Sequence, residues 1–255
     1  MTSAPTTTAE PRNVTPRPAA SRATWRTYVP GAAGAAYLAA WVAGLTVWPV
    51  NLPLNATAAQ AAASHAAHPA AAATQYVLVE GLAGLLLVAV VGSALLPMLR
   101  AGTGRRATLT AAALGSIAVL TSLTQCVLGV IVTSAARSGS ITTSGNLFKL
   151  MNQLDGVKML ALAVTAVCLA AIGRPIPALP SWLRATAVLL AMALAASGYA
   201  YLTLTNALGW TAFVSGVLLL LWVTGTGIAL TVRRRPPAAR ASRQGPSEAA
   251  FSWRS

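Results

Sequence analysis

Acidic residues are nearly absent from this chain of 255 residues, which contains four Asp and Glu in total. Charged residues of both signs make up 9% of the sequence, whereas a soluble domain would contain about a quarter. Hydrophobic residues make up 56% of it. This composition excludes an ordinary soluble domain and predicts a protein that exposes apolar side chains to lipid.

Histidine and cysteine are also scarce, with two residues of each kind. His65 and His68 both precede the second apolar run, so no pair of histidines can hold a haem inside a bundle and no intramembrane serine has a histidine base. Cys126 and Cys168 lack the Cys-x-x-Cys spacing of a thiol oxidoreductase and are expected to be small core residues. We therefore expect no enzymatic activity and no cofactor.

The spacing of His65 and His68 would place both imidazoles on one face of a helix, as a metal site requires. A tight site needs three or four ligands, however, and segment 51–75 contains no Asp, Glu or Cys. Pro69 also disfavours a helix that continues through it. We expect a long outer loop with solvated histidines and no bound metal.

Six long apolar runs dominate the rest of the sequence. Each is close to the ~20 residues that a helix needs to cross the hydrocarbon of a bilayer. The runs cover residues 29–50, 76–99, 107–135, 154–172, 185–204 and 208–232. They predict an all-α polytopic membrane protein whose six transmembrane helices form one bundle over residues 28–235.

Basic residues alternate between the two sides of this predicted bundle. Fifteen of the eighteen Lys and Arg residues lie before the first run, after the last run or in every second connection. The other three are Arg137, Lys149 and Lys158. The positive-inside rule then makes both termini cytoplasmic. It also explains the net charge of +14, so that charge does not suggest a nucleic-acid partner.

The two ends of the chain, residues 1–27 and 236–255, have no apolar periodicity and are expected to be disordered basic tails. The strong preference for Arg over Lys, together with frequent Ala, is typical of a high-GC bacterium. This predicts a multi-pass protein of the bacterial plasma membrane. Anionic lipids, or an unknown protein, are the expected partners of the tails.

Glycines recur within the runs, at Gly31, Gly34, Gly81, Gly84, Gly225 and Gly227. Small residues allow helix backbones to approach closely in lipid, so these positions predict a compact bundle. Trp48, at the end of the first run, is expected to be an interfacial anchor with no further role.

Several polar residues share a similar depth near the predicted outer face, and they form the candidate ligand site. Ionisable groups within spans are rare, usually face the bundle interior and are usually paired. We expect Glu80 to pair with Lys158, with Asp155 as a competing partner. The alternative is a purely structural role, in which these charges pair or extend toward water. The candidate residues are Glu80, Gln125, Asp155, Lys158, Tyr199 and Asn206.

Three features occur in a particular order: a loop with histidines before the second run, Leu154-Asp155-Gly156 at the start of the fourth, and Leu179-Pro180-Ser181-Trp182-Leu183 before the fifth. Because these features occur in this order, the chain resembles a group of uncharacterised six-span integral membrane proteins of high-GC bacteria, known as a domain of unknown function. The resemblance covers roughly Val29 to Arg235. It implies a six-span fold, and it implies no activity and no binding residues.

Two functional hypotheses remain open at this point. The absence of a catalytic set and the two basic tails favour a non-catalytic accessory or signalling membrane protein. The polar residues near the outer face favour instead a small transporter or a ligand-binding membrane protein.

Overall fold

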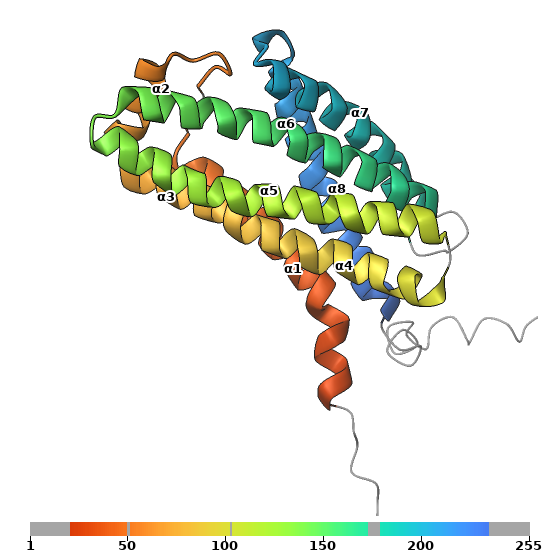
Figure 1. The fold of residues 1–255 in the computed structure, drawn as a ribbon. Helices are drawn as coiled ribbons and strands as arrows, with labels where there is room; N and C mark the ends of the chain where they lie inside the picture. Colours follow the sequence, from red (N-terminus) through yellow and green to blue (C-terminus); the bar gives the residue numbers. More distant parts are fainter. Residues whose placement is uncertain (1–20, 50–51, 103, 173–178, 235–255) are drawn as a thin grey trace, which may run out of the picture.

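The computed structural model describes residues 21–49, 52–102, 104–172 and 179–234 of the chain (Figure 1). These residues are 90% helical and include no strand. Six of their helices are long and apolar enough to cross a membrane, which confirms the predicted all-α, six-span class. Both predicted tails lie largely outside the described residues, at 1–20 and 235–255.

The spans are formed by long helices, and shorter ones connect them. The elements in chain order are α1 (Ser21–Val47), α2 (Ala58–Ala67), α3 (Pro69–Tyr76), the π-helical segment η1 (Val77–Leu82), α4 (Ala83–Ala101), α5 (Arg105–Arg137), α6 (Ile141–Ile172), α7 (Ser181–Thr203), the short 3-10 turn η2 (Asn206–Leu208) and α8 (Trp210–Arg234). The second span is the continuous run of α3, η1 and α4, from Pro69 to Ala101.

Three predicted boundaries are wrong by seven residues or more. The first helix begins at Ser21, so residues 21–27 are helical and not part of a disordered tail. The second span begins at Pro69 and the fourth at Ile141, both well before the predicted starts at residues 76 and 154. In each case polar or Ala-rich residues extend an apolar helix, because adding a residue to an existing helix costs far less than starting one.

The predicted outer loop, segment 51–75, is mostly helical. The hydroxyl of Thr57 accepts from the backbone N–H of Gln60, and the Gln60 side chain accepts from the backbone of Thr57, which forms a capping box at the start of α2. The helix ends before His68, and Pro69 begins α3, as the expected break at this proline requires. Helix α2 packs on α5 and α6, and α3 packs on α5 and α1.

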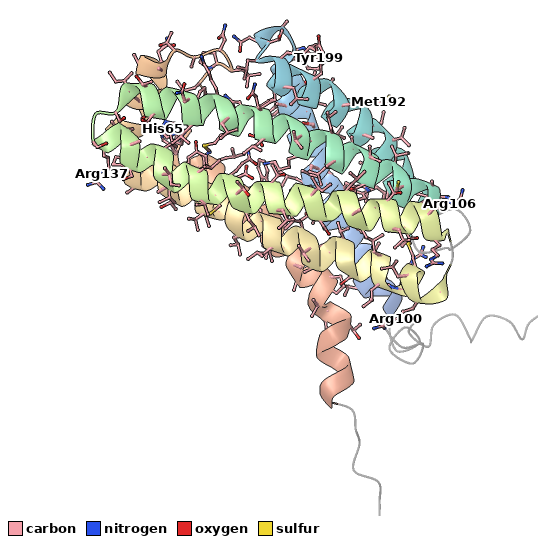
Figure 2. All side chains as sticks on the ribbon, in the orientation of Figure 1. His65, Arg100, Arg106, Arg137, Met192 and Tyr199 are labelled. Carbon is pink, nitrogen blue, oxygen red and sulfur yellow. The ribbon has the colours of Figure 1, made fainter. Side chains whose placement is uncertain are left out.

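The bundle has two chemically different ends (Figure 2). We call the end that carries α2 and α3 the cap end; Arg137, at the α5–α6 connection, lies there. The opposite end carries Arg100 and Arg106 at the α4–α5 connection, and we call it the arginine end. The backbone N–H of Gly31 donates to the Thr231 hydroxyl at 2.8 Å, which joins the start of α1 to the end of α8. Both ends of the described chain therefore lie on one side of the bundle.

Close helix contacts at glycines confirm the predicted compact packing. A Cβ at Gly156 on α6 would lie 2.8 Å from the carbonyl oxygen of Gly198 on α7, so neither position has room for a side chain. A Cβ at Gly34 on α1 would lie 3.2 Å from Cα of Thr224 on α8. The core between these helices consists mainly of Leu and Ala. Large apolar side chains are exposed on the outside, such as Leu120 and Phe213, as expected of a surface that faces lipid.

Candidate ligand site at the cap end

The ammonium group of Lys158 is the centre of a buried polar cluster. Lys158 Nζ lies 2.7 Å from Glu80 Oε2, 2.6 Å from Asp155 Oδ1 and 2.9 Å from Gln125 Oε1. The Lys158 side chain is 12% exposed and that of Glu80 is 11% exposed. The predicted Glu80–Lys158 pair is therefore confirmed. Asp155 does not compete with it, because the ammonium group has three donors and contacts all three acceptors.

Glu80 is placed in this cluster by an unusual stretch of helix. It lies in η1, the π-helical segment of the second span, and such segments are rare and frequent at functional sites. Ser122 Oγ on α5 lies 2.6 Å from Glu80 Oε2 and 3.0 Å from the Glu80 carbonyl oxygen, so the hydroxyl can donate to either. Since Ser122 and Lys158 both reach Oε2, the other carboxylate oxygen, Oε1, keeps its capacity to accept.

Gln125 is fixed between two helices. Its Nε2 donates to the backbone carbonyl of Met151 on α6 at 2.9 Å, and its Oε1 accepts from Lys158. The side chain is buried, with 1% exposure. Both ends of the amide are thus satisfied, which holds Lys158 in place.

The charges of the cluster do not balance. With all three groups ionised, Glu80, Asp155 and Lys158 carry a formal charge of −1.

The depth of the cluster in the membrane follows from the length of the second span. At about 1.5 Å per residue, the helix rises about 30 Å between Glu80 and Arg100, which is the thickness of the hydrocarbon core. If the exposed Arg100 lies at one membrane boundary, the cluster is close to the other boundary. A net negative charge there favours a cationic or hydrogen-donating ligand group.

Four aromatic residues form a second cluster at the cap end, which we call the aromatic cluster: Trp48, His65, Tyr76 and Phe148. The ring of His65 lies edge-on to Trp48 at a centroid distance of 4.9 Å and stacks on Tyr76 at 6.1 Å. Phe148 of α6 meets His65 at 6.4 Å. Tyr76 itself packs directly over Gly129 of α5, where a side chain would clash with the ring.

The prediction of solvated loop histidines is wrong for His65 and right for His68. His65 is completely buried, whereas His68 is exposed. His65 Nδ1 donates to the Ala61 carbonyl at 2.8 Å, so Nε2 is the acceptor for the Tyr76 hydroxyl at 3.0 Å. Burial lowers the pKa of His65 from its ordinary value of 6.5, and the hydrogen bond to Ala61 partly offsets this effect. The imidazole is therefore a neutral structural group at pH 7.

A cavity of about 180 Å³ is lined both by residues of the aromatic cluster and by Glu80 of the ion cluster. Trp48, Tyr76, Glu80 and Asn152 are among its lining residues, with His65, Phe148 and Tyr201. Two buried donors of this lining have no hydrogen-bond partner, namely Trp48 Nε1 and Asn152 Nδ2. Leaving a buried donor unpaired costs about 1–3 kcal/mol, so the cavity is suited to an occupant that accepts hydrogen bonds.

The structure brings together four of the six candidate residues predicted from the sequence: Glu80, Gln125, Asp155 and Lys158. Tyr199 is 59% exposed on the surface of α7 and does not line the cavity. Asn206 has a structural role, because it accepts from the backbone N–H of Leu54 and donates to the side chain of Asn55. It holds the segment before α2 against the turn between α7 and α8.

The candidate set left out several residues of the site, among them Trp48, His65, Tyr76, Ser122 and Asn152. For two of these residues, the spacing in the sequence indicates that they lie on the same helix face as a candidate residue. Tyr76 precedes Glu80 by four residues and Ser122 precedes Gln125 by three, so each lies near its partner on one helix face. Trp48 and His65 offered no such signal, since their meeting depends on how α2 folds back over the bundle.

The fold and the site together define a six-span helical membrane protein with a buried ion cluster beneath a helical cap. No family model, no curated protein and no solved structure matches this chain. The resemblance to a six-span group of high-GC bacteria therefore stays a prediction. Within the described residues, no three His, Cys, Asp or Glu side chains gather as a metal site would require.

Proposed function

We propose that this protein binds a small polar solute in the cavity at its cap end. The observation that carries the proposal is the pair of unpartnered buried donors, Trp48 Nε1 and Asn152 Nδ2, in the lining of a cavity that also contains the Glu80 carboxylate. Most buried polar groups in proteins have a partner. Two exceptions in one small cavity point to a ligand, or to water that a ligand displaces.

The lining suggests the chemistry of the solute. An acceptor group, such as a carboxylate, carbonyl or hydroxyl oxygen, would satisfy Trp48 and Asn152. A cationic or donor group would face Glu80, whose cluster carries the extra negative charge. The volume of about 180 Å³ is below the roughly 300–1,000 Å³ of drug-sized pockets. A zwitterionic molecule of amino-acid size or smaller meets all three conditions.

The geometry favours binding over transport. Glu80 also lines a second cavity on its other side, against Tyr37 and Trp41 of α1, and this cavity has a volume of only about 30 Å³. That is enough for about one or two water molecules and too little for a solute to pass. We accordingly propose a ligand-binding membrane protein in preference to a transporter.

We propose the bacterial plasma membrane as the location, with the cap end outside. The charge asymmetry along the chain supports this orientation. The alternative role as an accessory or signalling protein rests on the absence of a catalytic set in the sequence and on the basic tails, which lie largely outside the described residues. A protein that binds a solute outside and has basic cytoplasmic tails could still serve in signalling, so the two hypotheses are compatible.

Thermal unfolding of the detergent-solubilised full-length protein tests the proposal. The probes are glycine, serine, glycine betaine and ethanolamine, each at up to 50 mM. A ligand that binds only the folded state raises the melting temperature with concentration. We expect at least one probe to do so, and we expect Trp48→Phe and Asn152→Leu each to weaken its affinity about tenfold, since each removes one donor.

Matched substitutions outside the cavity serve as controls. Trp210→Phe changes a tryptophan that is 66% exposed at the start of α8, and Asn146→Leu changes an exposed asparagine on α6. Both should leave the ligand-induced shift unchanged. The proposal is wrong if none of the probes stabilises the wild type, or if the two cavity variants respond like their controls.

A further inference from the structure

A larger cavity lies in the half of the bundle nearer the arginine end. Its volume is about 370 Å³, and it is lined by residues of α4, α5, α6 and α8 that include Leu87, Val91, Leu95, Gly115 and Trp222. This volume is within the range of about 300–1,000 Å³ that is usual for ligand pockets. It is about twice that of the cavity at the cap end.

The chemistry of this lining is the opposite of that at the cap end. Its two hydroxyl groups are satisfied within their own helices, because Ser116 donates to the Ala112 carbonyl at 2.8 Å and Thr165 to the Ala161 carbonyl at 2.8 Å. Trp222 Nε1 is a buried donor without a partner. The rest of the lining is aliphatic, so the cavity suits an occupant that is almost entirely hydrocarbon.

The cavity is continuous with the surface that faces lipid. Three of its lining residues on α4 are among the exposed apolar side chains: Val88 at 48%, Leu96 at 47% and Leu99 at 40%. Gly92, between them, is exposed as well, and a Cβ there would meet no atom within 4 Å. The side of the cavity along α4 is therefore open to the acyl chains of the bilayer.

Three arginines lie at the end of this opening. Arg100 follows Leu99 directly, and Arg105 and Arg106 begin α5. All three are exposed, and Figure 2 shows Arg100 and Arg106 at the same end of the bundle. The acidic residues that the structure describes, Glu80 and Asp155, are both engaged with Lys158 in the cap-end half. The mouth of the cavity thus carries positive charge that no described carboxylate neutralises.

We propose that an anionic phospholipid binds here, with one acyl chain in the cavity between α4 and α5 and its phosphate against Arg100, Arg105 and Arg106. An acyl chain leaves an equally apolar environment when it enters the cavity, so hydrophobic burial alone gives little preference for the site. The preference comes from two sources, close packing in the cavity and the attraction of the arginines for an anionic headgroup. Close packing in the cavity favours any phospholipid, whereas the attraction of the arginines favours anionic phospholipids only.

Native mass spectrometry of the full-length protein with equal amounts of phosphatidylglycerol and phosphatidylcholine separates these sources. We expect the wild type to retain one phosphatidylglycerol in preference to phosphatidylcholine. Replacing the three arginines by Gln should reduce that preference about tenfold or more, because each basic residue near an anionic lipid contributes to it. Gly92→Leu should reduce retention of both lipids at least tenfold, because the new side chain occupies the cavity.

Gly216→Leu is the matched control for the cavity-filling change. Gly216 lies in α8, is absent from the cavity lining, and likewise has no atom within 4 Å of a Cβ. Both substitutions replace a helical glycine by a better helix former, so neither should unfold the bundle. Equal lipid retention in the two leucine variants would overturn the proposal, as would equal retention of the two lipids by the wild type.

Fluorescence quenching gives an independent measurement of where the acyl chain lies. Trp222 is the tryptophan of the cavity lining, and its signal is the difference between the wild type and Trp222→Phe. Phosphatidylglycerol with brominated chains should quench this difference signal, and Gly92→Leu should reduce the quenching. Quenching that is unaffected by Gly92→Leu would mean that the chain lies only on the outer surface, which contradicts the proposal.

Discussion

Substituting Glu80 and Lys158 singly and together should reveal a strong interaction between the second span and α6. Lys158 of α6 contacts Glu80 of η1, Gln125 of α5 and Asp155 of its own helix. Removing one partner of a buried ion pair costs about 3–5 kcal/mol, because the other charge stays buried. An exposed pair has a coupling of at most about 1 kcal/mol. The low exposure of both side chains, 12% and 11%, indicates the first case.

The three-way contact makes the two single substitutions unequal. Glu80→Gln leaves Lys158 paired with Asp155 and removes the excess negative charge, so we expect a cost of only about 1–2 kcal/mol in the free energy of unfolding. Lys158→Met leaves two carboxylates without a cation, so we expect the full cost of about 3–5 kcal/mol. The double variant retains only Asp155, which is 23% exposed and can be hydrated. Its destabilisation should therefore be smaller than the sum of the two by more than about 1 kcal/mol.

Denaturation in mixed detergent micelles measures these free energies. Lys149→Met is the matched control, because Lys149 is an exposed lysine on the same helix, and it should change stability by less than about 0.5 kcal/mol. The coupling should persist at 1 M salt, since buried pairs are screened far less than exposed ones. Additive costs in the double variant would refute the reasoning, and so would a coupling that disappears in salt.

Two further predictions concern the cap and its orientation. His65 has a folded-state pKa below its unfolded value of 6.5, so its contribution to stability is complete above pH 6.5 and is lost as the pH falls below it. The melting temperature should fall between pH 7 and pH 5, and His68→Gln should leave that fall unchanged; a flat profile would contradict the burial of His65. In intact cells, a cysteine at Ala63 should react with an impermeant thiol reagent and one at Ala101 should not, and the opposite pattern would reverse the proposed orientation.

The number of spans could be predicted from the sequence, because the thickness of the bilayer sets the length of apolar sequence that each span needs. The residues at which the helices begin and end could not be predicted in the same way. Residues 141–153 are polar enough to resemble a loop, yet they extend α6 to Ile141 because α2 packs against that helix. The capping box at Thr57 and Gln60 was a local signal for α2. The surrounding Ala-rich stretch has no apolar periodicity, so the sequence pattern as a whole still predicts a loop there.

The ion cluster was partly predictable for a related reason. A charged residue within a span needs a partner, and so few ionisable residues lie within the spans that Glu80, Asp155 and Lys158 could be matched by depth alone. Neutral groups are subject to no such constraint. Trp48 and His65 are ordinary residues for a helix end and a loop, and only the folding of α2 over the bundle brings them into contact. Tyr199 and Asn206 share the right depth but face other surroundings, since depth does not determine which side of a helix a residue occupies.

The distribution of hydrogen-bond partners at the cap end separates residues that hold the bundle from residues that would hold a ligand. The ammonium group of Lys158 has three donors and three acceptors in contact, so a ligand could engage it only by breaking an existing contact. Trp48 Nε1 and Asn152 Nδ2 have no partner to lose. Substitution of Lys158 should therefore change stability first, whereas Trp48→Phe and Asn152→Leu should change ligand affinity with little loss of stability. A ligand-binding site built this way keeps its charged groups fixed before the ligand arrives, which reduces the entropy lost on binding.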